Sequence, residues 1–287
     1  MQYLASICGL ATAERTDGKV RFGCRGGCPP YDKPDSGPDG RIEALAPTWE
    51  NNPFCELLEV YPGSFTRAGA AQVLLALKSP YMVSSFVDTS AVVVEHDGKR
   101  WRSVAHSKYA KADDAKLYRR DDGRDIVVGH DGFAGIHDGG SSWLYAIDFT
   151  QPKSSRESCF GKVAFNAFPV PCTVGDPPLI YPFFADPNVT DFTVDALDFA
   201  DVDGDGTREL VARVRYRHQP NTKALHAKVR AACKSRPFLS ENDYLPRAQS
   251  YTLVFRYDGS QFWPLPATRK LLETWKTAGP ERWYDHT

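Results

Sequence analysis

Short apolar runs separated by turn-forming residues dominate the chain from residue 56 onward. Runs of this length, bounded by Gly, Pro, Asn and Asp, are typical of β-strands. They form three sets of four: residues 56–61, 72–78, 91–95 and 100–105; residues 116–119, 124–129, 143–149 and 162–168; and residues 192–199, 209–216, 251–257 and 261–265. The Asp-Gly pairs at residues 97–98, 122–123 and 258–259 predict one tight hairpin in each set. The pattern predicts a mainly β fold of repeated four-stranded antiparallel units, either a small or partial β-propeller or a β-sandwich.

Two segments have the periodicity of short helices instead. Residues 221–235 place apolar side chains on one side and basic ones on the other, which is typical of an amphipathic helix. This helix lies in a long insertion, residues 219–249, between two strands of the third set. Residues 267–277 predict a C-terminal helix that docks through Leu271, Leu272 and Trp275.

The first 54 residues have a different texture. Residues 14–54 are rich in Gly, Pro, Asp and Cys and hold little that could form a core. We therefore expect an N-terminal arm over residues 1–54 and one β-rich domain over residues 55–287. The N-terminus has no basic segment and is too short for a secretory signal, so a mature chain cut from its signal is the simplest account.

Charge and hydropathy exclude some classes of partner. The 35 Lys and Arg residues nearly balance the 36 Asp and Glu residues, and no block of Lys and Arg is present. The balanced charge gives no net positive electrostatic potential that would attract nucleic acid or an anionic membrane. No apolar run approaches the roughly 18 residues of a membrane span. The expected partner is an unidentified protein or carbohydrate.

The seven cysteines bear on the compartment: Cys8, Cys24, Cys28, Cys55, Cys159, Cys172 and Cys233. Zinc would favour two close pairs, but only Cys24 and Cys28 are close, and buried free thiols are the alternative for some. Disulfides fit best, because Cys24 and Cys28 lie in a Gly/Pro-rich loop and Cys159 and Cys172 flank an apolar segment. We therefore expect an extracytoplasmic protein that is periplasmic, secreted or lipid-anchored.

The stretch from Asp198 to Val211 is the densest run of one chemistry in the chain, with four carboxylates within nine residues. Carboxylates two positions apart on a curved loop converge on one point, and calcium takes about six to eight oxygen ligands. Gly204 and Gly206 permit the left-handed backbone that this curvature needs. The expected calcium ligands are the carboxylates of Asp201, Asp203 and Asp205, the backbone carbonyl of Thr207, and Glu209 directly or through water.

The flanking sequence separates this loop from an EF-hand. An EF-hand carries a glutamate at about the twelfth position of its loop, where this chain has Ala212 in a strand-like run. Calcium is favoured over magnesium because no phosphate-binding context is visible in the sequence. The alternative is an acidic turn without metal, in which four close carboxylates would repel one another.

The residues Phe199-Ala-Asp-Val-Asp-Gly-Asp-Gly-Thr-Arg-Glu-Leu-Val211 resemble the FG-GAP/VCBS repeat, the calcium loop of integrin-type β-propellers and of many bacterial surface proteins. The family pattern is approximately F-x-D-x-D-x-D-G-x-x-D-L-V, and this chain departs from it at Glu209, where Asp is usual. The resemblance implies a loop that joins two strands of a propeller blade and that calcium holds rigid. A full propeller of this family has about seven blades, whereas three units fit here.

Two weaker likenesses accompany the motif. Residues 60–74 resemble the calcium stretch when Gly69 is placed with Gly206 and Gln72 with Glu209, but Ser64, Thr66 and Ala68 then stand where the three aspartates are. The first unit is therefore expected to keep the loop without the metal. Residues 62–70 and 122–128 are also similar to uncharacterised secreted or lipid-anchored bacterial proteins, a likeness that brings no activity with it.

A second candidate site lies in the Gly-rich residues 129–142, which we expect to form an exposed loop. His130, Asp131, His137 and Asp138 could form a two-His, two-carboxylate metal site, or a His–Asp pair that activates Ser141 or Ser142. Tripeptides ending in Asp-Gly most often form turns, however. The spacing of these His, Asp and Ser residues also matches no known nucleophile motif. Aromatic residues 181–184 and 262–264 could form a carbohydrate-stacking surface, although core packing is the more common role.

These observations favour a calcium-binding, β-rich protein that acts as a non-enzymatic binding or interaction module. The one strong motif makes a loop rigid and performs no reaction by itself. The alternatives are a secreted hydrolase that uses the His/Asp stretch at residues 129–142, and an immunity or inhibitor protein that blocks one partner.

Overall fold

The structure is a computed structural model of the whole chain. It describes residues 13–16, 19–23, 54–83, 86–108, 114–135, 139–151, 157–165, 170–171, 188–220, 222–236 and 238–277. Two compact units are present, one formed by residues 1–129 and 145–158 and the other by residues 130–144 and 159–287. The predicted domain limit between residues 54 and 55 stays a prediction.

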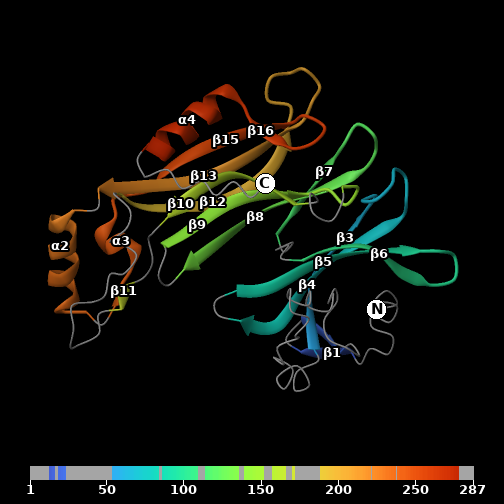
Figure 1. Cartoon of the computed structure of the whole chain (residues 1–287), viewed down its shortest axis with the longest axis horizontal. Coiled ribbons are helices and arrows are strands. Elements are labelled where there is room, and N and C mark those ends of the chain that lie inside the picture. The colour runs from blue at the N-terminus through green and yellow to red at the C-terminus, as the bar shows by residue number, and fades with distance from the viewer. Residues whose placement is uncertain are drawn as a thin grey trace, which may run out of the picture. The chain divides into compact units, whose positions relative to one another are not determined.

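The first sheet has six antiparallel strands in sequence order (Figure 1). They are β1 (Ala13–Thr16), β2 (Lys19–Gly23), β3 (Phe54–Gly63), β4 (Gln72–Val83), β5 (Phe86–His96) and β6 (Trp101–Lys108). The last four strands are the first predicted set. Residues 14–23 were expected to be loop, and this expectation was wrong, because β1 and β2 form a hairpin whose second strand pairs with β3.

The second sheet has four strands in the order β10-β9-β8-β7. They are β7 (Lys116–Arg119), β8 (Asp125–Gly135), β9 (Gly139–Ile147) and β10 (Glu157–Phe165). This is the second predicted set. The strand β8 runs six residues further than expected, so residues 130–135 and 139–142 are strand and not the exposed loop that their glycines suggested.

The third sheet contains β12 (Asn188–Ala200), β13 (Glu209–Pro220), β15 (Gln249–Tyr257) and β16 (Phe262–Pro264), in that order. Between β13 and β15 the chain forms α2 (Lys223–Cys233), β14 (Phe238–Leu239) and α3 (Glu241–Tyr244). The two-residue strand β11 (Val170–Pro171) pairs with β14. Helix α4 (Pro266–Thr277) follows β16, and α2 and α4 are the two helices that the sequence predicts.

The prediction of a mainly β fold built from four-stranded antiparallel sets, with few helices, is confirmed. Within the described part of the chain the sheets do not close into a propeller. The three sets arise because most neighbouring strands follow one another in the chain and are joined by turns or loops, whereas the insertion separates β13 from β15. At three of these turns, Gly98, Gly123 and Gly259 adopt positive φ angles that an L-residue rarely takes.

The strand β13 shows how the third sheet separates its two faces. Leu210, Ala212, Val214 and Tyr216 are buried, while Arg213 and Arg215 on the opposite face are exposed. Helix α4 lies along the apolar face (Figure 1). Its Trp275 stacks on Tyr216, with ring centroids 4.2 Å apart, and meets the rings of Phe192 and Tyr251 edge to face. The face with the arginines is therefore the one opposite α4.

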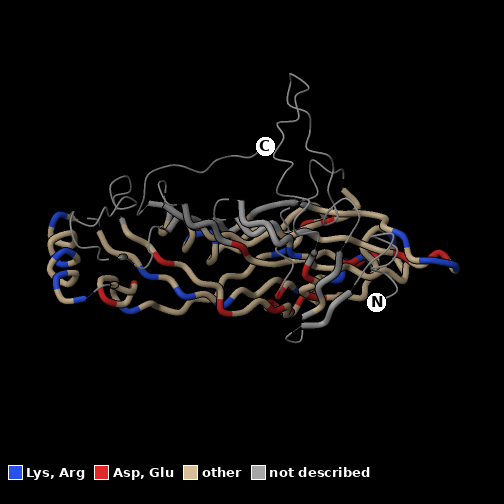
Figure 2. The backbone as a smooth tube through the Cα atoms, turned by 90° about the horizontal axis from the view of Figure 1, so that it is seen from below, with Lys and Arg blue, Asp and Glu red and all other residues tan. Residues whose placement is uncertain are grey.

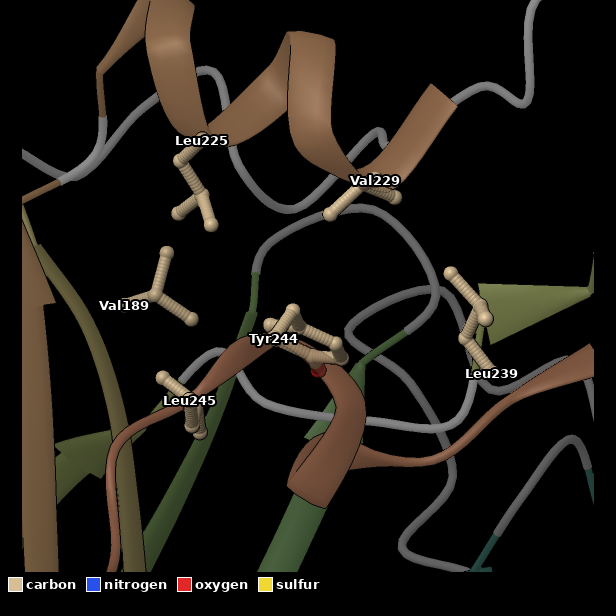
Figure 3. Close-up of a cluster of buried hydrophobic side chains, with 6 residues drawn as sticks. All are labelled: Val189, Leu225, Val229, Leu239, Tyr244 and Leu245. Atoms are coloured by element: carbon tan, nitrogen blue, oxygen red, sulfur yellow. The ribbon is translucent and has the colours of Figure 1, made fainter. Parts of the chain in front are cut away.

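Helix α2 is held by a small core of its own (Figure 3). Thr222 caps its N-terminus by accepting a hydrogen bond from the Leu225 backbone N–H. Its buried side chains, Leu225 and Val229, belong to one apolar cluster with Val189 of β12, Leu239 of β14, and Tyr244 and Leu245 at the end of α3. At the end of the helix, Cys233 is disulfide-bonded.

Charged positions of both signs are interspersed along the described backbone (Figure 2), in keeping with the balanced composition. No helix among the described residues is long and apolar enough to cross a membrane.

Candidate metal site

The acidic loop joins β12 to β13, two neighbouring antiparallel strands of the third sheet. The ladder between them ends at the pair Ala200 and Glu209, so residues 201–208 form the connection. Gly204 and Gly206 have φ angles of 78° and 88°, in the left-handed region that favours glycine. The loop therefore curves in the way that its sequence predicts.

Side-chain oxygens of the aspartates hold this curve by accepting backbone hydrogen bonds. Asp201 accepts from Gly204 N at 2.7 Å and from Gly206 N at 3.0 Å, one bond on each carboxylate oxygen. Asp205 Oδ1 accepts from Thr207 N at 2.8 Å, and this bond is the main reason that the pKa of Asp205 is lowered. The loop is thus pre-shaped by its own carboxylates.

Glu209 is the one fully buried member of the site, with none of its surface exposed. Its Oε2 accepts a hydrogen bond of 2.9 Å from Val202 N, which ties the start of the loop to its end. Its Oε1 accepts from Arg256 Nε at 2.9 Å. A buried carboxylate is stable only when such partners replace the water it has lost.

Oxygens of Asp201, Asp203 and Glu209 all lie within 4.8 Å of one another. Of the predicted ligands, the structure therefore brings these three together. Asp205 is not in this group but is tied to it, because Arg256 Nη1 lies 3.2 Å from Asp205 Oδ2. That the Thr207 carbonyl is a ligand stays a prediction.

Arg256, on β15, contacts the acidic loop, and the sequence pattern does not predict it. Its Nη2 donates to Asp203 Oδ2 at 2.6 Å and to Glu209 Oε1 at 2.6 Å. The hydrogen bonds to Glu209 and then Asp203 raise the pKa of Arg256, so it stays charged. Leu210 pairs with Phe255 in the ladder, which sets Arg256 beside Glu209 across the two strands. The only sequence signal was an arginine next to a predicted hairpin.

The donor set fits a calcium ion in two respects. Calcium binds oxygens at about 2.3–2.6 Å, so oxygens on opposite sides of one ion are about 5 Å apart, and the three carboxylates lie within that span. The oxygens are also of the hard carboxylate kind that calcium prefers. Arg256 offers a competing positive charge to two of the same side chains, Asp203 and Glu209.

The first unit contains a loop of the same construction between β3 and β4. Gln72 Oε1 accepts from Phe65 N at 2.8 Å, seven residues earlier, as Glu209 accepts from Val202 N. Gly69 has a φ angle of 69°, as Gly206 has 88°. Gln72 also pairs across the sheet with Glu95, to whose Oε2 it donates at 2.7 Å. The loop shape is present, and the one metal-type acidic cluster among the described residues is the second loop.

The described residues of the His/Asp alternative do not converge in the same way. His130 and Asp131 are consecutive residues of β8, so their side chains leave the strand on opposite faces. His137 and Asp138 lie outside the described residues, and Ser141 and Ser142 belong to β9.

Of the aromatic residues considered for a carbohydrate-stacking surface, one is buried, one is exposed, and one group lies outside the described residues. Phe262 is buried and stacks on Phe160, so it is core, while Trp263 is exposed and donates its Nε1 hydrogen bond to Asp258. Residues 181–184 lie outside the described residues.

Comparisons of the chain with known protein families, with curated proteins and with solved structures found no match. The resemblance of the loop to the FG-GAP/VCBS repeat therefore stays a prediction from its residues.

Proposed function

We propose that the loop from Asp201 to Glu209 binds calcium and that the protein is an extracytoplasmic binding or interaction module which this ion stabilises. The observation that carries the proposal is the convergence of Asp201, Asp203 and Glu209 within 4.8 Å on a loop already curved by two left-handed glycines. Asp205 and Thr207 are the remaining expected ligands. Bound calcium supplies the positive charge that lets these carboxylates stay close.

In this proposal Arg256 is the internal counter-ion of the loop. It touches Asp203, Asp205 and Glu209, so it offsets part of their mutual repulsion when calcium is absent. Arg256 and Arg208 together carry two positive charges against four carboxylates, which leaves the loop acidic enough to attract a divalent cation. Arg256 and calcium therefore compete for the same oxygens.

A role in binding is favoured over catalysis by the chemistry of the loop. Its carboxylates accept hydrogen bonds from the loop's own backbone and so fix the shape of the loop, as expected of a structural site. No observation in the described residues favours the hydrolase or the immunity protein. The disulfide at Cys233 supports an oxidising, extracytoplasmic compartment.

Isothermal titration of calcium into chelator-treated protein tests the site. We expect saturable binding to the wild type and at least about tenfold weaker binding to Asp203→Asn, which removes one charged oxygen ligand. Asp198→Asn is the matched control, because Asp198 is exposed on β12 and lies outside the converging group. The absence of any binding heat in the wild type, or equal loss in both variants, would reject the calcium site.

A further inference from the structure

A polar pocket of about 320 Å³ lies on the face of the third sheet opposite α4. The ladders place Thr193, Arg215 and Ser250 in one row across β12, β13 and β15, and Asp191 and Arg217 in the next row. The insertion between β13 and β15 supplies the remaining wall. The lining residues are Asp191, Thr193, Arg215, Arg217, Asn242, Arg247, Ala248 and Ser250.

Two of the three arginines are fixed in place by neighbours. Arg217, whose side chain is 10% exposed, donates Nε to Asp191 Oδ2 at 2.7 Å and Nη1 to Asn242 Oδ1 at 2.7 Å. Arg215 is held by Asp195, to which its Nε donates at 2.8 Å. A guanidinium has five N–H donors, so each of these arginines keeps donors for a ligand.

Arg247 has no hydrogen bond or ion pair to any described residue. It is exposed, yet the segment before it is anchored, because Tyr244 and Leu245 are buried in the core beneath α2. Gln219 adds a hydrogen bond from its side chain to the Tyr244 carbonyl. The insertion therefore places a free guanidinium at the rim of the pocket.

The lining is rich in donors and poor in acceptors. Three arginines and one aspartate line the pocket. Arg217 is paired with Asp191, and Arg215 is paired with Asp195, so Arg247 carries the positive charge that no described carboxylate offsets. The hydroxyls of Thr193 and Ser250 add further donors. Such a pocket suits a ligand that carries a negative charge and several oxygens. Among the described lining residues Ala248 is the only apolar one, so none of them offers an aromatic ring to stack a nucleobase or another flat ring.

We propose that this pocket binds an anionic sugar unit, with the carboxylate or phosphate of the sugar on Arg215, Arg217 and Arg247 and its hydroxyls on Thr193 and Ser250. The volume is in the range of small-molecule sites and exceeds what a single inorganic anion needs. The inference rests on the proposed role as a binding module, whose ligand class it names, and not on the calcium site.

The test is titration of the full chain with glucuronate, glucose 6-phosphate, glucose and inorganic phosphate. We expect glucuronate or glucose 6-phosphate to bind with a dissociation constant of about 1 mM or tighter, and glucose and phosphate to bind at least about tenfold more weakly. Which of the two sugars binds identifies the charged group. The Arg247→Gln variant should weaken that binding about tenfold, since it removes one charge-assisted contact without disturbing the fold.

Arg213→Gln is the matched control. Arg213 is exposed on the same face of β13, has no partner among the described residues and does not line the pocket. It should change the affinity less than about twofold. The proposal is overturned if neither anionic sugar binds, if glucose or phosphate binds as tightly as they do, or if both arginine variants lose affinity equally.

The same titrations are run with chelator and with calcium. Calcium binding without sugar binding would overturn the sugar pocket and leave the calcium site standing. Sugar binding without calcium binding would do the reverse.

Discussion

Arg256 and Glu209 form the residue pair on which the acidic loop depends. Glu209 is fully buried, and its Oε1 receives two hydrogen bonds from the Arg256 guanidinium. The same guanidinium reaches Asp203 and Asp205 on the loop. Arg256 therefore links the buried Glu209 to the exposed Asp203 and Asp205, and its positive charge offsets part of the repulsion among these carboxylates.

Replacing Arg256 by Gln should have two opposite effects. Without calcium the melting temperature should fall, because the carboxylates lose their counter-charge and Glu209 stays buried. The calcium dissociation constant should tighten about tenfold, since a competing unit charge a few ångströms from the ion is removed. Thermal unfolding in chelator and calcium titration measure the two effects, with Arg213→Gln as the control. If Arg256→Gln weakens calcium binding, the guanidinium is not a competitor.

At this scale the sequence predicts the carboxylates but not their partner. Asp201, Asp203 and Glu209 are close in the chain, so their spacing alone indicates convergence. Arg256 lies 47 residues from Glu209, and the insertion separates the two. Only the register of β13 against β15 brings them together, and a pattern of apolar positions does not fix that register across an insertion.

The strand–loop–strand element that carries the site is present twice. In each copy the first residue of the second strand, Gln72 or Glu209, accepts from a backbone N–H seven residues earlier. In each copy that residue also meets a partner on the next strand, Glu95 or Arg256. The carboxylate of the pair is exchanged between the two strands. In the first copy the Gln72 amide and the Arg67 guanidinium contact the Glu95 carboxylate. In the second copy the Glu209 carboxylate contacts the Arg256 guanidinium.

This exchange predicts that Gln72→Glu is strongly destabilising. Gln72 is buried and donates to Glu95, so the variant sets two carboxylates about one hydrogen bond apart. We expect a loss of about 2 kcal/mol in the free energy of unfolding at pH 7, measured by urea denaturation. In the wild type the hydrogen bond from Gln72 is the main cause that lowers the pKa of Glu95.

The loss should shrink as the pH falls. The lowered pKa of Glu95 means that its contribution in the wild type is full above the pKa of an unfolded glutamate and is lost below the folded one. In the variant, protonation of either carboxyl relieves the repulsion, so the two proteins should converge near pH 4. The control is Gln249→Glu at an exposed site, which should change stability by less than about 0.5 kcal/mol. A gap that is equal at both pH values would contradict the pairing.

Most elements follow from the sequence because a half-buried strand alternates and an Asp-Gly turn ends it. β13 is the clearest case, with buried and exposed positions in turn. The β1–β2 hairpin is missed although Asp17-Gly18, the same turn-forming pair, separates its two strands in the sequence. The surrounding Gly- and Pro-rich residues outweigh that local pattern. The extension of β8 over residues 130–135 is missed because its glycines and His-Asp pairs are turn-forming when read alone.

At the scale of the molecule, the second unit carries both candidate sites, and the insertion between β13 and β15 has a part in one of them. It supplies Asn242, Arg247 and Ala248 to the polar pocket. The helix α2 and the disulfide at Cys233 belong to the same insertion. The sequence predicts that this insertion contains a helix. The pocket could not be predicted, because its residues come together only through the pairing of β12, β13 and β15.

We propose that calcium stabilises this fold through the loop from Asp201 to Glu209. The most direct test is the melting temperature of chelator-treated protein before and after addition of calcium. When free calcium exceeds its dissociation constant about a hundredfold, binding to the folded state alone should raise the melting temperature by about 5–10 °C. The Asp203→Asn variant should show a much smaller rise. An unchanged melting temperature in the wild type would show that calcium does not stabilise the fold.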